Sequence, residues 1–289
     1  MSLRDLISED ELLLAPGIYD ALSGLIATQS GAKAVYLSGA SLAYTRFGTS
    51  DIGLVSVSEV NDTIAAITDR IATPIIVDGD TGFGNALNVQ RTVRSFERSG
   101  AHAIQLEDQS FPKRCGHLDG KKLISINEMV GKIYAALDAR ANEDTLIIAR
   151  TDARAVEGFA EAIDRAGAYK DAGADILFVE APQSLNEMQK ICAEFAHKIP
   201  LLANMVEGGK TPISDANALA ALGYKIAIFP GGAVRAISYH MQAYYTGLLA
   251  NGSNEPFSNK MHNFDSLNNL IGTKELIEHG AKYENKGKK

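Results

Sequence analysis

Short runs of apolar and β-branched residues recur along most of the chain. Eight of them are too short for stable helices and are almost continuously apolar, which is typical of parallel strands buried on both faces. These runs lie at residues 12–18, 34–39, 74–80, 103–108, 146–152, 176–181, 200–206 and 225–231. Alanine-rich stretches with helical spacing separate many of the runs, and several end in a Gly that can stop a helix. The predicted helices cover residues 58–70, 86–99, 126–139, 159–172 and 216–222.

Repeated alternation of strand and helix predicts an α/β fold, namely a closed (β/α)8 TIM barrel. A doubly wound open sheet is the alternative. Two further helical stretches, at 237–250 and 267–279, follow the last predicted strand. We therefore expect one barrel domain over 1–289, in which 236–289 form a C-terminal helical extension packed on the barrel or on a neighbouring subunit.

Polar residues gather where the predicted strands end. Asp78-Gly79-Asp80, Glu107-Asp108 and Arg150-Thr151-Asp152 close three strands, and Glu180 and Asn204 close two more. A charge is costly inside a barrel wall, whereas the C-terminal mouth of such a barrel is where active sites lie. The pattern therefore predicts an enzyme.

Composition and charge narrow the classes of partner. The 289 residues include 28 Lys and Arg against 35 Asp and Glu, a formal net charge of −7. This balance disfavours a broad nucleic-acid-binding surface, and no apolar run approaches the roughly 18 residues of a transmembrane helix. Two cysteines make no disulfide framework, and the first residues do not follow the signal-peptide pattern. We expect a cytoplasmic protein that binds neither nucleic acid nor membrane and meets an anionic substrate with a few local cations.

Asp78 and Asp80 are candidate metal ligands. In an extended segment residues i and i+2 point to the same side, so both carboxylates can face one point. Two hard oxygen donors, with room left for water and substrate oxygens, suit Mg2+. A pair of turn or capping aspartates is the structural alternative.

A second candidate is the Lys-Arg-Cys-Gly-His segment at 113–117. Three cationic or potentially cationic side chains around Cys115 are expected to lower its pKa and favour the thiolate. A buried, inert cysteine is the alternative, and Cys192 is expected to be of that kind because it fits one face of a helix. Cys115 and His117 lack the spacing and number of ligands of a zinc site.

Six segments resemble the isocitrate lyase/phosphoenolpyruvate mutase superfamily, in unbroken order between about residues 12 and 250. They are Tyr-Leu-Ser-Gly (36–39), Val-Asp-Gly-Asp-Thr-Gly-Phe-Gly (77–84), Leu-Glu-Asp-Gln (106–109), Lys-Arg-Cys-Gly-His (113–117), Ala-Arg-Thr-Asp-Ala (149–153) and Val-Glu-Ala-Pro (179–182). The chain looks like the short lyase branch, which contains 2-methylisocitrate lyase and 2,3-dimethylmalate lyase. This resemblance implies a barrel whose C-terminal helix is swapped between subunits, in a homotetramer.

The resemblance also implies a role for individual residues. Asp78 and Asp80 would hold Mg2+, with Mn2+ as a possible substitute, and Asp51 and Glu107 would lie close to the metal or to its ligands. Cys115 would be the acid/base on a gating loop. The expected substrate-binding residues are Tyr36, Ser38, Gly39, Ala40, Gly116 and Arg150, together with Glu180, Asn204 and Arg235 for the distal part of the substrate. Lys113 and His117 would lend charge to the catalytic loop.

The activity implied is an Mg2+-dependent carbon–carbon lyase that cleaves a 2-hydroxy dicarboxylate of the 2,3-dimethylmalate type to pyruvate and a short acid such as propionate. Leu118 stands where methylisocitrate enzymes generally have Arg, and 261–267 offer no Arg for an extra carboxylate, which favours a dicarboxylate. Pro230 stands where oxaloacetate hydrolases tend to carry serine. The enzyme alternatives are 2-methylisocitrate lyase and a carboxyphosphonoenolpyruvate phosphonomutase or oxaloacetate decarboxylase. A ligand-sensing barrel is the non-enzyme alternative.

Overall fold

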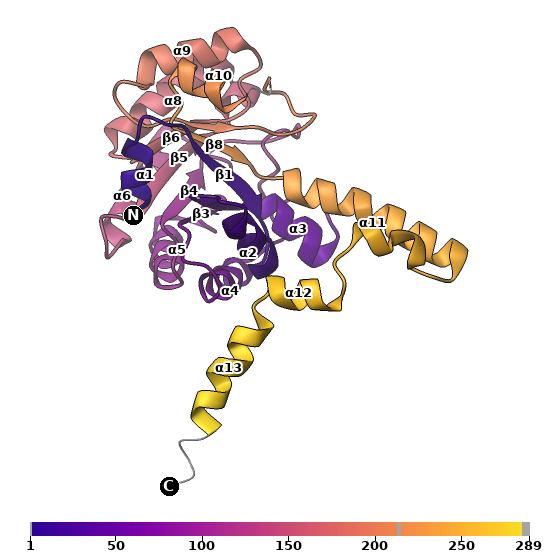
Figure 1. Ribbon diagram of the computed structural model, residues 1–289. Helices are drawn as coiled ribbons and strands as arrows, with labels where there is room; N and C mark the ends of the chain where they lie inside the picture. The colour runs from indigo at the N-terminus through magenta and orange to yellow at the C-terminus, as the bar shows by residue number, and fades with distance from the viewer. Residues whose placement is uncertain (1, 213–214, 285–289) are drawn as a thin grey trace. The chain divides into compact units, whose positions relative to one another are not determined.

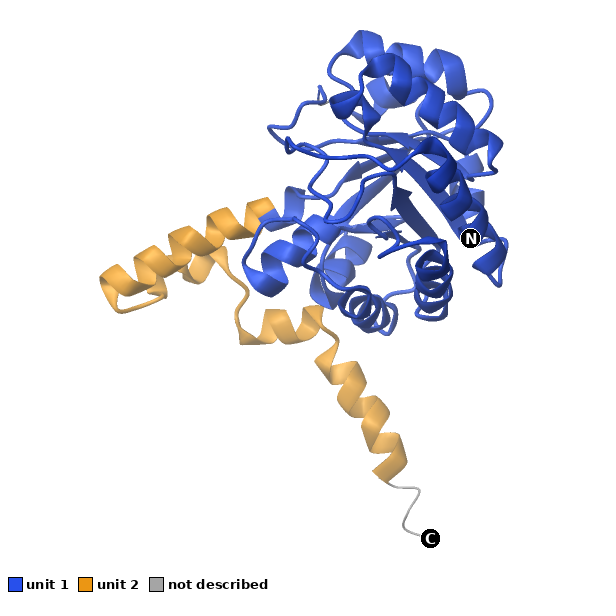
Figure 2. Ribbon diagram, turned by 180° about the vertical axis from the view of Figure 1, so that it is seen from behind, with its two compact units in different colours: residues 1–234 blue, residues 235–289 orange. Residues whose placement is uncertain are grey.

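The computed structural model describes residues 2–212 and 215–284 (Figure 1). These residues belong to two compact units, Met1–Val234 and Arg235–Lys289 (Figure 2). No helix among the described residues combines the length and the apolar character that crossing a membrane requires.

The first unit is built on a sheet of eight parallel strands within the described residues. They are β1 (Leu13–Ile18), β2 (Val35–Leu37), β3 (Ile75–Asp78), β4 (Ala103–Glu107), β5 (Leu146–Thr151), β6 (Ile176–Val179), β7 (Leu202–Asn204) and β8 (Ile226–Phe229). The strands pair in the order β6-β5-β4-β3-β2-β1-β8-β7, and a parallel bridge from Leu177 in β6 to Leu201 nearly closes the ring. The predicted TIM barrel is confirmed, with a strand inside each of the eight predicted runs.

Helices surround this barrel. They are α1 (Leu3–Ser8), α2 (Ala21–Gln29), α3 (Gly39–Phe47), α4 (Val57–Thr68), α5 (Ala86–Arg98), α6 (Ile126–Ala139), α7 (Ala153–Val156), α8 (Phe159–Asp171), α9 (Leu185–Phe195) and α10 (Ala216–Leu222). Side-chain caps start many of them: Ser56 accepts a hydrogen bond from the Glu59 amide, and Glu59 bonds back to the Ser56 amide. Such a reciprocal pair satisfies amides that have no partner within the helix. The five predicted helices correspond to α4, α5, α6, α8 and α10.

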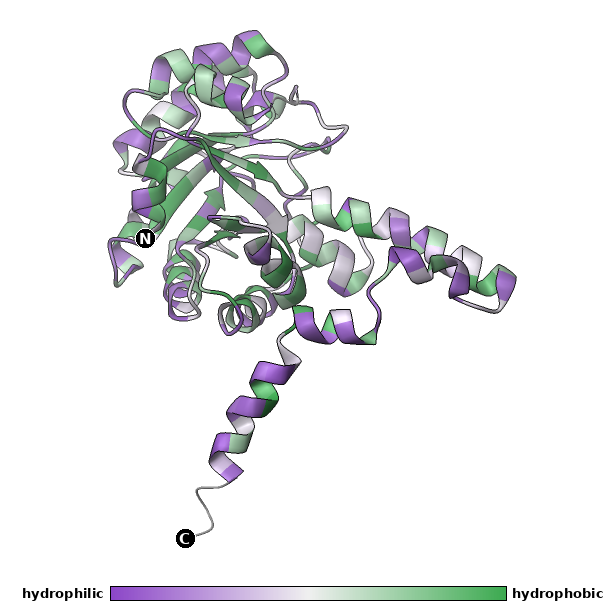
Figure 3. Cartoon of the chain, viewed as in Figure 1, coloured by the Kyte–Doolittle hydropathy of each residue, from purple (hydrophilic) through white to green (hydrophobic). Residues whose placement is uncertain are grey.

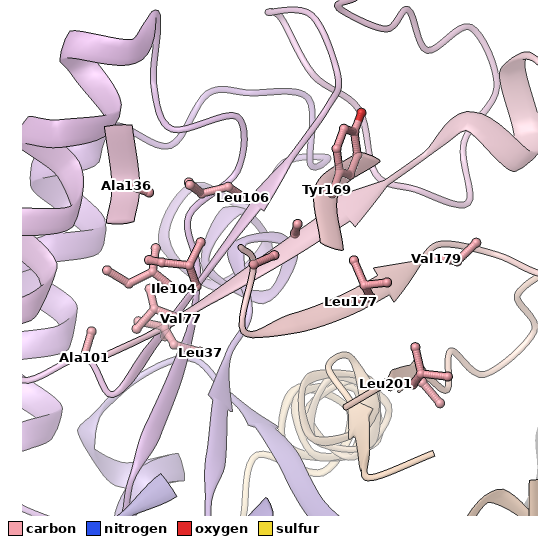
Figure 4. Packing of buried hydrophobic residues seen from close by; sticks show 14 of the residues in the cluster. Leu37, Val77, Ala101, Ile104, Leu106, Ala136, Tyr169, Leu177, Val179 and Leu201 are labelled. Carbon is pink, nitrogen blue, oxygen red and sulfur yellow. The ribbon is translucent and has the colours of Figure 1, made fainter. Parts of the chain in front are cut away.

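Two apolar clusters hold the barrel and its helices together, because alternate residues of a strand face opposite sides. Leu37 and Val77 belong to the cluster between the strands and the helices, part of which is drawn in Figure 4. Tyr36 and Ile76 belong to a second cluster, which lies inside the barrel. In Figure 3 the strands are correspondingly more apolar than the helices around them.

Helix α1 closes the amino-terminal end of the barrel, so that only the other end is open for an active site. Its residues Leu3, Leu6 and Ile7 join the inner cluster together with residues at the starts of strands, such as Leu13 and Leu146. The amino-terminal end of the barrel is therefore filled with apolar side chains. The opposite end, where the strands finish, carries the buried polar groups.

The second unit contains α11 (Gly232–Asn251), which begins just before the unit boundary, η1 (Glu255–Lys260), α12 (Phe264–Leu270) and α13 (Thr273–Glu284). The single helix predicted over 267–279 is wrong, because the chain forms two helices separated at Gly272, which has a left-handed φ of 73°. Several large apolar side chains of this unit are exposed, including Leu249 and Phe264. Residues 285–289 of the predicted extension lie outside the described residues.

Candidate active site

Three buried carboxylates converge where β3 and β4 end. Asp78, Asp80 and Glu107 each offer an oxygen, and these three atoms lie within 4.8 Å of one another. The two aspartates do not meet by strand alternation as expected: Asp80 follows the strand in a left-handed conformation with φ of 47°, a region that Asp tolerates better than most residues. A Cβ on the intervening Gly79 would lie 2.6 Å from the Gln105 carbonyl oxygen, so this tight turn requires glycine.

Hydrogen bonds fix the carboxylate of Asp78. Its Oδ1 accepts from Nε2 of Gln105 at 3.1 Å and from the Asp80 amide at 3.2 Å. Its Oδ2 accepts from the Gly39 amide at the start of α3, at 3.3 Å. The Tyr36 hydroxyl in turn donates to Oε1 of Gln105 at 2.8 Å. The sequence analysis missed Gln105, although it is the one polar residue between the apolar positions of its strand.

Three further residues were predicted to bind the substrate, namely Ser38, Ala40 and Arg235. Ser38 caps α3, because its Oγ accepts from the Ser41 amide at 3.2 Å, and Ala40 is the second residue of that helix. Gly39, which lies between them, is the residue whose amide contacts Asp78. Arg235 belongs to α11 in the second unit, so its substrate-binding role stays a prediction.

Lys113 connects the loop that carries Cys115 (residues 113–121) to the carboxylates. Its Nζ lies 2.6 Å from Oδ1 of Asp51 and 2.6 Å from Oδ1 of Asp80. Burial alone would lower the pKa of Lys113, but the Asp80 and Asp51 carboxylates hold that pKa well above its ordinary value. Burial also raises the pKa of Asp80 to about 7, with Lys113 opposing the rise and Asp78 adding to it. The lysine is therefore a fixed cation at the edge of the cluster.

Arg150, near the end of β5, ties three carboxylates together. It makes a two-pronged bond to Asp152, from Nε at 2.9 Å and Nη2 at 3.1 Å. Its Nη1 lies 3.3 Å from Oε2 of Glu107, and its Nη2 lies 3.7 Å from Oε1 of Glu180. Asn204 Nδ2 donates to both oxygens of Glu180, at 3.3 and 3.2 Å. The predicted residues from β4, β5, β6 and β7 thus meet in one network.

The Cys115 loop lies over this network. The Cys115 amide donates to the Asp51 carbonyl at 3.1 Å, and a Cβ on Gly116 would lie 2.1 Å from Oε1 of Glu180 and 2.5 Å from Nη2 of Arg150. His117 Nε2 lies 3.4 Å from the same Glu180 oxygen. Residues before and after Cys115 in the chain therefore contact the side chains that surround the carboxylate triad.

The expected thiolate is not supported, because burial raises the pKa of Cys115. The charges next to it in sequence are directed elsewhere. Lys113 reaches Asp80, and Arg114 donates through Nη1 to the Asp119 carbonyl. Burial lowers the pKa of His117, so this ring lends no positive charge near neutral pH. Cys115 consequently holds its proton, which suits an acid better than a nucleophile.

The tautomer of His117 follows from its contacts. Its Nδ1 accepts a hydrogen bond from the Lys210 amide at 3.0 Å. The proton of the neutral ring is therefore on Nε2. Nε2 lies 3.4 Å from Oε1 of Glu180 but makes no hydrogen bond among the described residues, so the link from His117 to the Lys210 amide is the hydrogen bond that this ring provides.

The donors present fit a divalent cation. The network holds more buried carboxylates than buried cations, which leaves net negative charge away from water. Oε1 of Glu107 accepts no hydrogen bond from any residue that the structure describes. Three carboxylates within ligand distance of one point are hard donors suited to such an ion. Besides the mutually paired Asp108 and Arg165, the buried carboxylates of the network are Asp51, Asp78, Asp80, Glu107, Asp152 and Glu180, and its buried cations are Lys113, Lys121 and Arg150.

Known proteins are similar to nearly the whole length of this chain. A family model described as phosphoenolpyruvate phosphomutase matches residues 3–249. The chain belongs to the phosphoenolpyruvate mutase/isocitrate lyase superfamily. It is 42% identical over 278 residues to the 2,3-dimethylmalate lyase of Eubacterium barkeri, covering 96% of this chain and 95% of that protein. It is 44% identical over 286 residues to the 2-methylisocitrate lyase of Aeropyrum pernix, covering 98% of this chain and 91% of that protein.

Solved structures of this superfamily agree with the barrel. A crystal structure of 2,3-dimethylmalate lyase has a TM-score of 0.92 at 35% identity and covers 97% of this chain and 93% of that chain. A structure of oxaloacetate acetylhydrolase has a TM-score of 0.92 at 33% identity and covers 97% and 96%. The predicted family is confirmed, and the relatives of this superfamily member include lyases that act on small organic acids.

Proposed function

We propose that this protein is an Mg2+-dependent lyase that cleaves a 2-hydroxy dicarboxylate, 2,3-dimethylmalate or a close analogue, to pyruvate and a short acid such as propionate. The observation that carries the proposal is the contact between the Cys115 loop and the carboxylate network. Lys113, two residues before the thiol, reaches Asp80, and Gly116, directly after it, packs against Glu180 and Arg150. The relative from Eubacterium barkeri is named for this reaction.

Asp78, Asp80 and Glu107 would hold the metal, and Mn2+ has the same preference for oxygen ligands. A metal ion held by these residues would supply Lewis-acid stabilisation of the negative charge on the substrate oxygens. Gly39 and Arg150 place N–H groups beside the same carboxylates. They are positioned to orient the substrate carboxylate and to stabilise the negative charge that develops when the bond breaks.

Cys115 supplies the proton that the reaction needs. Cleavage between C2 and C3 leaves an electron pair on C3 of the departing acid, and the substrate hydroxyl loses its proton as pyruvate forms. Sγ of Cys115 donates its proton to C3, and the thiolate is reprotonated from solvent before the next turnover. The proton of the 2-hydroxyl leaves to solvent, so one proton is released for each proton that the thiolate regains. A raised pKa keeps the thiol protonated near neutral pH, as a general acid requires. The loop also excludes water from the carbanion.

The charges around the site disfavour a third carboxylate on the substrate. Lys113, Lys121 and Arg150 each lie within 4.0 Å of a carboxylate of the protein itself. Close to Glu180, His117 is neutral, and Asn204 provides an amide rather than a cation. A third substrate carboxylate would meet no fresh positive charge among these residues. The relative from Aeropyrum pernix nevertheless makes 2-methylisocitrate the second candidate substrate.

A pyruvate-release assay tests the proposal. The parent protein is given 2,3-dimethylmalate, 2-methylisocitrate and oxaloacetate with Mg2+, with Mn2+ and with EDTA, and isocitrate is scored in parallel by release of glyoxylate, the 2-oxo acid that its cleavage yields. We expect pyruvate from 2,3-dimethylmalate in preference to the others, and none in EDTA. Cys115→Ser is expected to fold normally and to lose at least about 100-fold in kcat, the usual scale for general acid–base catalysis. Cys192→Ala is the matched thiol control, because Cys192 packs in the helix layer.

Two outcomes would reject parts of this function. Full turnover by Cys115→Ser would show that Cys115 is not the general acid. Faster pyruvate release from 2-methylisocitrate than from 2,3-dimethylmalate would make 2-methylisocitrate the preferred substrate. Phosphonopyruvate or oxaloacetate turnover that survives loss of Cys115 would point to a mutase or decarboxylase. Binding of oxalate in the presence of Mg2+ without any turnover would indicate a ligand sensor.

We also propose a cytoplasmic homotetramer in which the C-terminal helix is swapped between subunits. The exposed apolar side chains of the second unit support burial in an assembly, since single exposed Leu and Phe residues are ordinary but a series along one unit is not. Tyr239, Leu249, Phe264 and Ile277 are 73%, 84%, 83% and 67% exposed. Light scattering on the purified protein measures the assembly, and a monomer would reject it.

A further inference from the structure

One buried lysine of the Cys115 loop has no part in the function proposed above. Lys121 lies eight positions after Lys113, and its side chain is only 1% exposed. Its Nζ donates to the Gly116 carbonyl, directly after Cys115, and lies 3.3 Å from Oδ1 of Asp152. The ammonium therefore joins the tip of the loop to the barrel.

The barrel side of this contact is rigidly held. The Asp152 amide donates to Oδ1 of Asp108 at 2.9 Å, and Arg150 binds both carboxylate oxygens of Asp152. Asp108 itself accepts hydrogen bonds from Thr151 at 2.7 Å and from Tyr169 at 2.8 Å. Burial would raise the pKa of Asp152, but Arg150 and Lys121 hold it below its ordinary value. Lys121 thus binds a fixed anion.

Hydrogen bonds also hold the loop down: the Gln109 side chain makes two with the Arg114 backbone, at 2.8 and 2.9 Å, and the Cys115 amide donates to the Asp51 carbonyl at 3.1 Å. The other ion pairs of the loop are exposed or involve the carboxylates of the site. Lys210 pairs with Asp119 at 2.9 Å, but these side chains are 35% and 93% exposed, and an exposed ion pair contributes little. Lys113 binds the carboxylates themselves. Opening the loop at Lys121 would instead leave the buried carboxylate of Asp152 with one cation fewer, which is unfavourable because a buried charge needs its partners.

We propose that Lys121 is a positioning residue, which holds Cys115 over the site by joining the Gly116 carbonyl to Asp152. Its catalytic meaning rests on the proposed function of Cys115, but its effect on the loop does not. Lys121 touches the backbone next to the thiol rather than the reacting atoms. Its loss should therefore change how often the thiol is uncovered.

Cys115 is only partly buried while the loop is closed, so the change in its alkylation rate between variants, rather than the rate itself, reports this opening. Reaction with iodoacetamide followed by peptide mass spectrometry measures that change without any substrate. The matched control is Lys122→Met, because Lys122 is the exposed neighbour of Lys121 and carries the same charge. In Lys121→Met we expect Cys115 to react about tenfold faster or more, which corresponds to an opening easier by about 1.4 kcal/mol. Lys122→Met should react at the parent rate.

Cys192 distinguishes loop opening from general unfolding within the same sample. It is buried in α9 against the helix layer, so loop opening leaves its alkylation rate unchanged. Faster reaction of both cysteines in proportion, or an unchanged rate for Cys115, would overturn the proposal. If Lys121→Met does not fold, Lys121→Gln keeps a donor for the Gly116 carbonyl while removing the ion pair, and the same comparison applies with a smaller expected increase.

Turnover provides an independent check. Where the parent releases pyruvate, Lys121→Met should lower kcat while the midpoint of the Mg2+ titration stays at the parent value, since the triad is untouched. A lower Mg2+ affinity with an unchanged Cys115 alkylation rate would overturn the proposal. If the parent cleaves none of the acids tested while Cys115 still reacts faster in Lys121→Met, the proposed function fails and the positioning role stands.

Discussion

Gly116→Ala should prevent the Cys115 loop from closing. The added Cβ would lie 2.1 Å from Oε1 of Glu180 and 2.5 Å from Nη2 of Arg150, whereas ordinary contacts begin at 3.4 Å. Neither side chain can move aside easily, because Asn204 holds Glu180 and Asp152 holds Arg150. The loop has to retreat by about 1 Å instead, and a misplacement of about 1 Å can lower the rate roughly 100-fold.

Steady-state pyruvate release at saturating substrate and Mg2+ measures this effect. We expect kcat of Gly116→Ala to fall about 100-fold, with little change in melting temperature, because the loop opens locally without unfolding the core. The matched control is Gly131→Ala in α6, where an added Cβ meets nothing within 4 Å. That control should keep its kcat and gain about 0.5–1 kcal/mol of stability. A Gly116→Ala enzyme within twofold of the parent would refute the reasoning.

Proton binding, a buried lysine and a buried tyrosine give three further predictions. The folded protein binds a proton at Asp80 more tightly than the unfolded chain does, because folding raises the pKa of this carboxyl from 3.8 to about 7. The stability that this proton contributes is complete below pH 3.8 and is lost as the pH rises through about 7. In EDTA the melting temperature should therefore be lower at pH 8 than at pH 5. Excess Mg2+ should raise the melting temperature most at pH 8, where no proton competes. Lys132→Met leaves the buried Thr81 carbonyl without the 3.0 Å hydrogen bond from Nζ, and urea unfolding should show a loss of about 1–3 kcal/mol. Tyr169→Phe removes the 2.8 Å bond to Asp108, and the same measurement should show a loss of about 1.5–3 kcal/mol.

Each of these has a control or a contrary result. Melting in EDTA that is independent of pH between 5 and 8 would contradict the raised pKa of Asp80. Lys122→Met is the control for Lys132→Met, and Tyr134→Phe is the control for Tyr169→Phe, since both control side chains are exposed. Equal unfolding free energies in variant and control would contradict the energetic value assigned to the buried bond.

The carboxylate network could be predicted because its members share one sequence signal. Strands buried on both faces are apolar until they end, so polar residues such as Asp78, Glu107 and Glu180 mark the barrel mouth. Barrel closure then brings residues far apart in the chain to the same end. The structure places all three in the contact network around Arg150 and the carboxylate triad.

The electrostatics of the loop could not be predicted in this way. The sequence shows which charged residues are next to Cys115 in the chain, but not the direction of their side chains. Lys113 extends to Asp80 instead of the thiol, and burial raises the pKa of Cys115. Lys121 and Lys122 look alike in sequence, yet one is buried against Asp152 and the other is exposed. The break at Gly272 was missed because the apolar spacing continues across it.

The carboxylates and the thiol sit on parts of the fold with different freedom to diverge. The triad stands on strand ends that the whole barrel supports, whereas Cys115 is carried by the connection between β4 and α6. Loops tolerate substitution and length change far better than barrel strands. A descendant of such a chain can therefore keep its carboxylate triad and acquire a new reaction by changes in one connection. Lyases, an acetylhydrolase and a phosphomutase do share this scaffold.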